Sequence, residues 1–278
     1  MKKSIAILMS TYNGDRFLRE QLDSIVNQDN NDWCLYIRDD GSLDRTLDII
    51  KEYVSKYDNI YSISDNVNKG AAMSFLSMLE VIESEYYMFC DQDDVWFQNK
   101  VSSSLDYFNS VCKDPKKDIC LVFSDAQVVD QNLNVIDKSF WKFSKSFPEI
   151  LKSNTSLIKV FNCAPGCTMF FNENLKMHVT KYGKNMLMHD WFLMLKAIEF
   201  GEVFYIDKQL MLYRQHSSNV LGADKTSYSS LANKFLSIKK TIKHQKELYK
   251  FVEENSKTNL LEYYYLKTVF NFKRFLYF

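Results

Sequence analysis

Tyr-Tyr-Met-Phe-Cys-Asp-Gln-Asp-Asp-Val-Trp, residues Tyr86–Trp96, is the stretch that most strongly indicates the fold of this chain. Its first five residues form a continuous apolar and aromatic run, which is typical of a buried strand. Three carboxylates follow within four positions, at Asp91, Asp93 and Asp94. Like charges this close repel one another, and a bound divalent cation would relieve the repulsion because hard cations prefer oxygen ligands. An ordinary acidic surface loop is the alternative.

Strand and helix patterns alternate along the first half of the chain. Strands are expected at 4–10, 33–38, 60–64, 86–90 and 119–124, with helical spacing of apolar residues between them. Such alternation predicts an α/β fold with a parallel sheet covered by helices on both faces. After residue 125 the pattern loosens into a loop-rich insertion at 139–156, a helix opening at 188–191 and short strands at 202–206 and 209–213.

Polar clusters follow three of the expected strands. Thr11–Asn13 comes after the first strand, Asp39 and Asp40 after the second, and the three carboxylates at 91–94 after the fourth. In open α/β sheets, ligands bind in the crevice at the carboxyl ends of the strands. We therefore expect these clusters, far apart in the sequence, to converge on one rim of the sheet.

Composition excludes some classes of partner. Lys plus Arg and Asp plus Glu are equal at 35 each in the 278 residues, so no overall positive field indicates nucleic-acid binding. The six cysteines are scattered and indicate reduced thiols in a cytoplasmic protein rather than a disulfide framework. No stretch approaches the roughly 20 apolar residues that span a bilayer.

Short motifs in a fixed order resemble a known family. Ser10-Thr11-Tyr12-Asn13-Gly14, Asp39-Asp40-Gly41-Ser42, Asp91-Gln92-Asp93-Asp94 and His189-Asp190 together resemble the family 2 glycosyltransferases of the GT-A fold. The stretches 90–96, 166–169 and 213–216 are similar to the bacterial rhamnosyltransferase-like branch. The resemblance covers about the first 220 residues and implies a Rossmann-like mixed sheet with helices on both faces. We expect a GT-A domain at residues 1–224 and a helical appendage at 225–278.

The resemblance implies a metal site in the acidic stretch. A nucleotide-diphospho-sugar donor has a leaving group whose charge grows as the glycosidic bond breaks, and a divalent metal stabilises that charge. Asp91 and Asp93 match the DXD element, Asp93 for direct metal contact and Asp91 for the metal or the ribose. Asp94 could contact the sugar or the metal shell. His216 could complete the shell of Mn²⁺ or Mg²⁺, and an ordinary surface histidine is the alternative.

The first two polar clusters are expected to bind the nucleotide. The resemblance implies that Asp39, ahead of Asp40, accepts a hydrogen bond from the base. Thr11, Tyr12 and Asn13 would lie beside the base, with Tyr12 stacking on it. The alternative is local: Thr11 and the two carboxylates could cap the helices that follow them, and both roles can hold at once.

Two basic residues and a bend complete the expected donor and acceptor contacts. Lys69 and Arg214 could reach the diphosphate, although Lys69 would also suit a solvated turn. Gly166, Cys167 and Thr168 lie in a bend. The spacing of Cys167 from the preceding cysteine suggests metal only superficially, so we expect this bend to line the acceptor pocket.

Asp190 is the candidate general base. Single displacement needs a carboxylate on the opposite side of the anomeric carbon to take the proton of the acceptor hydroxyl. Asp190 stands at an expected helix start between His189 and Trp191, which would lie on the acceptor side. Helix capping is the alternative, and the inverting outcome is implied by the resemblance alone.

The tail from residue 225 is basic and aromatic. It has eleven Lys and Arg against four Glu, a net charge of +7. That composition fits a helix lying on an anionic membrane surface, at the inner face of the plasma membrane. A helical cap on the domain and a homodimer interface are the alternatives.

Taken with these residues, the resemblance implies an inverting, metal-dependent glycosyltransferase. Its donor would be dTDP-rhamnose or a UDP-hexose, and its acceptor a glycan or lipid-linked carrier in bacterial surface polysaccharide synthesis. A metal-dependent phosphohydrolase or nucleotidyltransferase is a second candidate, but the chain lacks a glycine-rich phosphate loop. A non-catalytic nucleotide-sugar-binding partner of a larger synthase is a third, and Asp190 argues against it.

Overall fold

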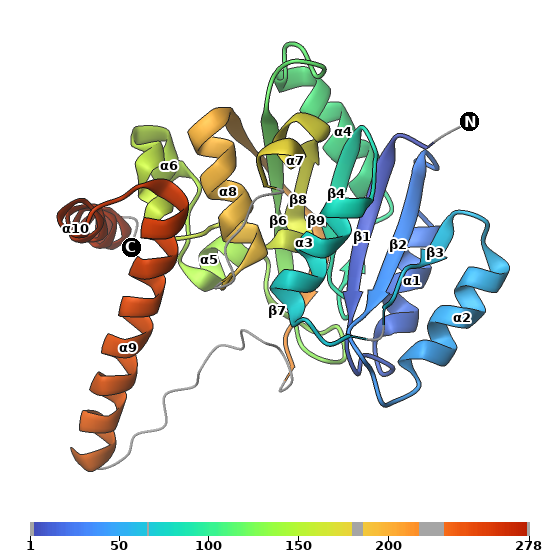
Figure 1. Cartoon of the computed structure of the whole chain (residues 1–278), viewed down its shortest axis with the longest axis horizontal. Coiled ribbons are helices and arrows are strands. Elements are labelled where there is room, and N and C mark those ends of the chain that lie inside the picture. The colour runs from blue at the N-terminus through green and yellow to red at the C-terminus, as the bar shows by residue number, and fades with distance from the viewer. Residues whose placement is uncertain (1–2, 66, 180–185, 217–230, 277–278) are drawn as a thin grey trace.

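A central sheet with helices on both sides forms the body of the protein, and two long helices end it (Figure 1). This computed structural model describes residues 3–65, 67–179, 186–216 and 231–276, with side chains after residue 216 described from Lys243 onward.

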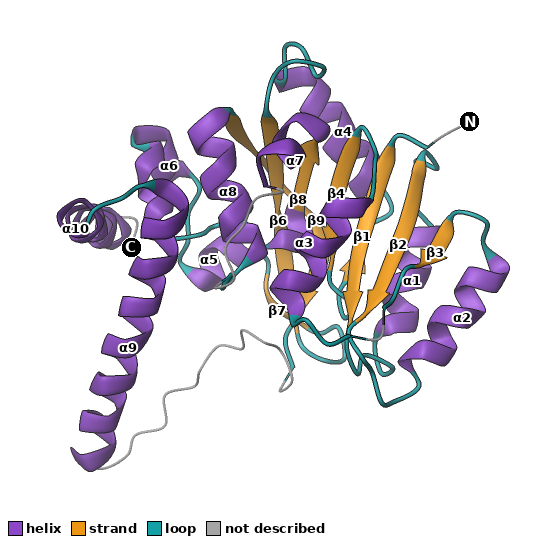
Figure 2. Cartoon of the chain, in the orientation of Figure 1, coloured by secondary structure: helices purple, strands orange, loops and turns teal. Residues whose placement is uncertain are grey.

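The described residues form one mixed sheet of nine strands (Figure 2). Its strands are β1 (Ile5–Thr11), β2 (Trp33–Asp39), β3 (Ile60–Ser62), β4 (Tyr86–Cys90), β5 (Val95–Trp96), β6 (Cys120–Val129), β7 (Val135–Asp137), β8 (Met169–Asn172) and β9 (Glu202–Arg214). Their order is β3-β2-β1-β4-β8-β6-β9-β5, with β7 on β6. The mixed sheet of the GT-A fold is therefore confirmed.

The parallel sheet that strand–helix alternation predicts is interrupted after β4, although β6 and β9 are again parallel to each other. Strands β3, β2, β1 and β4 are parallel, but β8 lies between β4 and β6 and is antiparallel to both. All four residues of β8 are buried, and Phe170 pairs with Met88 on one side and Val122 on the other. Alternation predicts neighbours that are close in sequence, whereas β8 arrives from about 80 residues after β4. The two strands expected at 202–206 and 209–213 form one continuous strand, β9.

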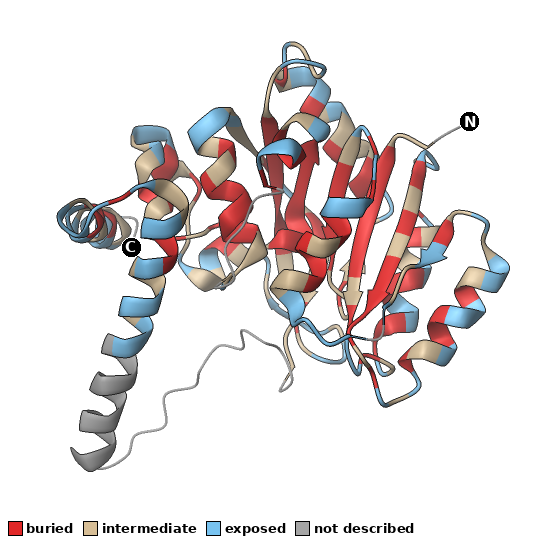
Figure 3. Cartoon of the chain, viewed as in Figure 1, coloured by how far each residue is buried: buried red, intermediate tan, exposed pale blue. Residues whose placement is uncertain are grey.

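Helices cover both faces of the sheet, as predicted. Buried side chains of α1 (Leu18–Val26), α2 (Thr46–Lys56) and α4 (Lys100–Val111) pack on one face. Those of α3 (Ala71–Val81), α7 (Glu173–Val179) and α8 (His189–Phe200) pack on the other. Strand β1 alternates between them, with Ile7 on the first face and Leu8 on the second. Figure 3 shows the buried strands between these two layers.

The segment expected to be a loop-rich insertion contains short helices. These are α5 (Phe140–Ser144), α6 (Glu149–Ser153) and the start of the 3-10 helix η1 (Thr155–Lys159). A second 3-10 helix, η2 (Gly166–Thr168), forms the bend that was expected after it. Trp141 is buried, and its Nε1 donates to the carbonyl of Cys163 at 3.0 Å. The buried residues Trp141, Ile150 and Leu151 explain why the insertion packs on the core instead of extending into solvent.

The chain ends in α9 (Leu231–Ser256) and α10 (Leu260–Leu276). Phe251, Tyr263, Leu266 and Phe270 are buried in the same apolar cluster as α8. The expected domain boundary at 224/225 lies outside the described residues. Within the described ranges, no helix combines the length and the apolar character needed to cross a bilayer.

Candidate active site at the carboxyl ends of the strands

The loops after β1 and β2, which we call the base-side loops (residues 11–14 and 39–42), are joined through Asp39. Asp39 Oδ1 accepts from the hydroxyls of Thr11 at 2.9 Å and Ser42 at 2.5 Å. Its Oδ2 accepts from the amides of Gly41 at 3.0 Å and Ser42 at 2.8 Å. Both Thr11 and Asp39 are buried. These bonds hold the two loops together and do not cap a helix, because the described helices α1 and α2 have no side-chain cap bond. Any contact of Asp39 with a base stays a prediction.

Asp40 organises the next loop toward the third strand. Its carboxylate accepts from the guanidinium of Arg38 at 2.5 Å and from the amides of Lys69 and Gly70, both at 2.7 Å. The Lys69 ammonium pairs with Asp65 at 2.6 Å, and both side chains are partly exposed. The turn is thus built by backbone contacts to Asp40, and the expected reach of Lys69 to a diphosphate stays a prediction.

Gln92 ties the base-side loops to the acidic stretch. Its Oε1 accepts from the amide of Tyr12 at 2.8 Å, and its Nε2 donates to the carbonyl of Tyr12 at 3.0 Å. A Cβ at Gly14 would lie 2.1 Å from Gln92 Oε1, so only glycine permits this approach. The Tyr12 side chain remains 48% exposed, with a ring face that a base could stack on. Asn13 uses its side-chain oxygen to accept from the amide of Leu43 at 2.8 Å.

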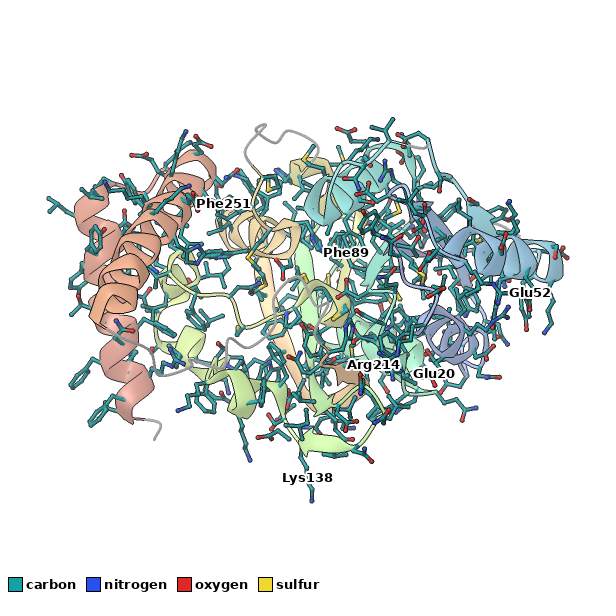
Figure 4. All side chains as sticks on the ribbon, turned by 90° about the horizontal axis from the view of Figure 1, so that it is seen from below. Glu20, Glu52, Phe89, Lys138, Arg214 and Phe251 are labelled. Atoms are coloured by element: carbon teal, nitrogen blue, oxygen red, sulfur yellow. The ribbon has the colours of Figure 1, made fainter. Side chains whose placement is uncertain are left out.

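The end of β9 fixes the acidic stretch from the other side. Strand β5 pairs with β9, which brings Arg214 beside Asp93 and Asp94. The amide of Arg214 donates to Asp94 Oδ1 at 3.0 Å, and its Nε donates to the carbonyl of Asp93 at 2.6 Å. Its guanidinium also pairs with Glu20 at 2.5 Å and donates to the carbonyl of Gln131 (Figure 4). Because Arg214 is 1% exposed, these contacts favour a positioning role, and its phosphate contact stays a prediction.

His216 meets the metal-binding candidate Asp93. The ring Nε2 lies 2.9 Å from Asp93 Oδ2, and the ring packs on Phe17 with centroids 4.8 Å apart. The structure therefore brings together Asp93 and His216, two of the three residues that the sequence proposed as metal ligands. A histidine ring nitrogen at this distance from a carboxylate oxygen can rotate to bind a cation that is held by the same carboxylate.

A second set of potential metal ligands lies deeper. One carboxylate oxygen each of Asp91 and Asp94 and the thiol of Cys167 lie within 4.8 Å of one another. Asp94 Oδ2 is buried and has no hydrogen-bond partner among the described residues. Burial, and secondly the Asp93 carboxylate, raises the pKa of Asp91 to about 7, and burial also raises the pKa of Asp94. An orphaned oxygen among buried carboxylates fits a divalent cation, which would supply the missing positive charge.

Lys100 is a buried cation that the sequence analysis missed. Its ammonium donates to the carbonyl of Cys167 at 2.5 Å and lies 4.4 Å from the centre of the Trp96 ring. It is fully buried at the start of α4, beneath the acidic stretch. Burial lowers the pKa of Lys100, and the charges of Asp94 and Asp91 oppose that shift. Nothing in the hydrophobic pattern distinguishes this lysine from a solvated one at a helix start.

Asp190 stands in the first turn of α8, next to η2. It is buried, its Oδ1 accepts from the amide of Trp191 at 2.6 Å, and burial raises its pKa to about 6. A Cβ at Gly166 would lie 2.6 Å from His189 Nε2 and 3.4 Å from the Cβ of Asp190, so glycine lets η2 approach α8. Burial also lowers the pKa of His189 to about 3, so its ring is neutral at physiological pH.

The short helix η2 links the predicted residues of the acidic stretch to those around Asp190. Cys167 and Gly166 are adjacent in η2, so this short helix connects the acidic stretch to Asp190. Thr168 closes η2, because its hydroxyl and its amide both bond the carbonyl of Pro165. Trp191 is buried, and its Nε1 donates to the carbonyl of Ile158 at 2.6 Å. It is therefore less exposed than a residue that contacts the acceptor is expected to be. Gln92, like Lys100, was not assigned a role from the sequence, although it lies inside the decisive stretch.

Comparison with solved structures supports the same fold. TarS 1–349 of S. aureus, solved in complex with UDP, superposes with a TM-score of 0.59 at 18% identity, over 76% of this chain and 60% of that one. The mannosyltransferase PcManGT of Pyrobaculum calidifontis, solved with GDP-Man and Mn²⁺, gives 0.58 at 14% identity, over 77% and 57%. This chain thus spans less than two thirds of either structure.

Sequence comparison assigns the family. Residues 6–178 match the family model of Glycosyl transferase family 2. The dTDP-rhamnosyl transferase RfbG of Shigella flexneri is 33% identical over 230 residues, which cover 78% of this chain and 74% of that protein. These matches favour glycosyl transfer over the hydrolase and scaffold alternatives. The chain therefore belongs to glycosyl transferase family 2 and has the GT-A fold.

Proposed function

We propose that this chain transfers rhamnose from dTDP-rhamnose to a glycan or lipid-linked acceptor with inversion at the anomeric carbon. The similarity to RfbG supports this donor, and a UDP-hexose is the second choice because TarS was solved with UDP. One observation carries the proposal: η2 joins the acidic stretch, where a diphosphate and its cation would bind, to Asp190.

The base would bind between Tyr12 and Asp39. The exposed ring of Tyr12 offers a stacking surface, and the buried Asp39 carboxylate lies under the same loop. Two of the four hydrogen bonds to Asp39 come from hydroxyls, which can rotate. If the hydroxyl of Thr11 rotates away, Oδ1 gains a lone pair for the N–H of a pyrimidine base. The hydrogen bonds from the backbone amides of Gly41 and Ser42 would still hold the carboxylate in place.

The acidic stretch would hold a divalent cation, Mn²⁺ or Mg²⁺. Asp91, Asp93 and Asp94 supply carboxylate oxygens, and His216 and Cys167 lie against them. When bound, the cation neutralises the negative charge that develops on the departing diphosphate. Arg214 and Lys100 would keep the carboxylates in place, because each holds a backbone carbonyl of this region.

Asp190 would act as the general base. At neutral pH it is mostly a carboxylate, because its pKa of about 6 lies below 7. As the acceptor oxygen forms its bond to the anomeric carbon, the bond from that carbon to the diphosphate oxygen breaks. The hydroxyl proton passes to Asp190, and the nucleoside diphosphate leaves with the bonding electron pair. Attack opposite the leaving group inverts the configuration at the anomeric carbon.

We place this reaction in bacterial surface polysaccharide synthesis, in the cytoplasm at the inner face of the plasma membrane. A lipid-linked acceptor would be met there, and the basic tail would contact that membrane. A homodimer through the same tail is the competing use of this segment.

A donor and metal matrix tests the function. The protein is incubated with dTDP-rhamnose, UDP-glucose or UDP-GlcNAc, with Mn²⁺, Mg²⁺ or EDTA, and with an extracted lipid-linked acceptor. We expect dTDP release matched by an equal amount of rhamnosylated product, with the inverted anomer identified by NMR. Release of dTDP without glycoside would overturn transfer in favour of hydrolysis. Retained configuration would overturn the single-displacement step.

A further inference from the structure

Helix α10 has two apolar stripes on opposite sides. Tyr263, Leu266 and Phe270 form the inner stripe, which is buried in the core. The outer stripe is exposed and consists of Leu261, Tyr264, Tyr265, Phe272, Phe275 and Leu276. Leu261, Phe272 and Phe275 are 85%, 65% and 76% exposed. At 3.6 residues per turn, these three side chains fall within about 60° of one another and roughly opposite Phe270.

This second stripe is not needed for packing against the body of the protein. The inner stripe already buries α10 against η1 and α6, with Phe161 and Phe270 stacked at 4.3 Å between ring centroids. A surface helix of a globular protein typically has one apolar stripe and a polar opposite face. An exposed set of aromatic and leucine side chains, interrupted by Thr268, marks an interaction surface instead.

Charges on α10 determine which partner fits. Its one acidic residue, Glu262, is neutralised by Lys159 at 2.7 Å. Lys267, Lys273 and Arg274 are basic and lie between the two stripes. Lys267 and Arg274 have their charged groups 5.6 and 6.0 Å from the rings of Tyr263 and Phe270, so both border the inner stripe. An apolar row flanked by cations complements a surface that is apolar inside and anionic outside.

We propose that the outer stripe of α10 docks the protein on an anionic lipid bilayer. The helix lies in the plane of the surface, the rings of Phe272 and Phe275 enter the boundary between headgroups and acyl chains, and the basic side chains contact lipid phosphates. This inference rests on the proposed function in one respect: a lipid-linked acceptor is confined to the membrane surface, which gives the protein a reason to bind that surface. A second copy of the chain docked on the same stripe is the competing occupant.

Vesicle co-sedimentation of the full chain tests the docking. We expect binding to phosphatidylglycerol/phosphatidylcholine vesicles and at least tenfold weaker binding to pure phosphatidylcholine. Phe272→Glu/Phe275→Glu should lower binding to the anionic vesicles at least tenfold. Lys273→Gln/Arg274→Gln should lower it about 25-fold and flatten its salt dependence, because each basic residue near such a surface contributes about fivefold.

The matched control is Val81→Glu/Val135→Glu, which adds the same two charges at exposed positions of α3 and β7. It should bind vesicles nearly as well as the unaltered chain. Equal losses of vesicle binding in Phe272→Glu/Phe275→Glu and in Val81→Glu/Val135→Glu would overturn the proposal. So would analytical ultracentrifugation showing a dimer that Phe272→Glu/Phe275→Glu dissociates while vesicle binding is unchanged.

Failure of docking is distinguishable from failure of the proposed function. The thermal shift produced by dTDP with Mn²⁺ reports the donor site without any lipid. We expect it to be the same in Phe272→Glu/Phe275→Glu and the unaltered chain. A normal donor shift without vesicle binding overturns the docking surface alone, and vesicle binding without any donor shift overturns the proposed donor alone.

Discussion

The base-side loops and the acidic centre (Asp91, Asp93, Asp94 and Asp190) meet at the same edge of the sheet but differ in how their carboxylates are satisfied. Asp39 accepts from four donors, three in its own loop and one on Thr11. Asp94 has one oxygen bonded to an amide and the other buried without a partner among the described residues. The carboxylate of the first region is fully hydrogen-bonded without a ligand, whereas the second region keeps a buried carboxylate oxygen without a partner among the described residues. This difference suggests that the nucleotide pocket is preformed and that the reaction centre is completed by binding.

Loss of the base in the acidic centre should have the largest effect. Asp190→Asn keeps the size of the side chain but removes its capacity to take a proton, and we expect transfer to fall about 10²–10⁴-fold. Donor affinity, measured by titration calorimetry with dTDP and Mn²⁺, should stay within about threefold. Asp48→Asn is the matched control, because Asp48 is also in the first turn of a helix but is exposed. Activity retained in Asp190→Asn would show that another group takes the proton.

The same substitution in the base-side loops should instead damage the fold. In Asp39→Asn an N–H₂ group replaces one acceptor oxygen, so some of the four donors lose their partner. We expect the free energy of unfolding in urea to fall by about 1–3 kcal/mol, with or without Mn²⁺. Asp94→Asn should cost less than about 1 kcal/mol in EDTA, because the Arg214 amide is the backbone donor to this carboxylate among the described residues and the other oxygen has no hydrogen-bond partner there. Equal losses in the two variants would contradict the comparison.

The acidic centre should also make stability depend on pH. The pKa values of Asp91 and Asp190 are raised to about 7 and about 6, above the value near 4 in an unfolded chain. Such a carboxyl stabilises the fold while protonated; this contribution is complete below about pH 4 and is lost progressively as the pH rises to about 6 for Asp190 and about 7 for Asp91. In EDTA we therefore expect Tm to fall from about pH 5 to about pH 8.

Mn²⁺ should reverse that trend, since a cation favours the ionised carboxylates. The Tm increase caused by Mn²⁺ should be larger at about pH 8 than at about pH 5. Differential scanning calorimetry at both pH values, with and without Mn²⁺, measures this increase in Tm. An increase independent of pH would place the cation away from Asp91.

The two regions also differ in how well the sequence predicts them. The first four strands and their loops follow from local patterns, because each polar cluster directly follows an apolar run and parallel strands place their carboxyl ends together. The placement of β8 does not follow, since Phe170 pairs with strands about 50 and 80 residues earlier. The contact of Cys167 with Asp91 and the burial of Lys100 depend on that strand. Long-range packing, rather than any local signal, assembles the acidic centre.

The smallest expected effect concerns the sulfur in the acidic centre. Cys167 lies with Asp91 and Asp94 in the potential metal set, whereas Cys163 is equally buried and outside it. A thiol is a soft ligand, so it should matter more to Cd²⁺ than to Mn²⁺. We expect Cys167→Ser to change the Mn²⁺ affinity less than about threefold and to weaken Cd²⁺ binding at least about tenfold, with loss of the ultraviolet thiolate–cadmium band. Cys163→Ser is the control and should leave both unchanged. If Cys167→Ser leaves the cadmium band intact, the sulfur only packs against the carboxylates, and oxygen ligands alone complete the site.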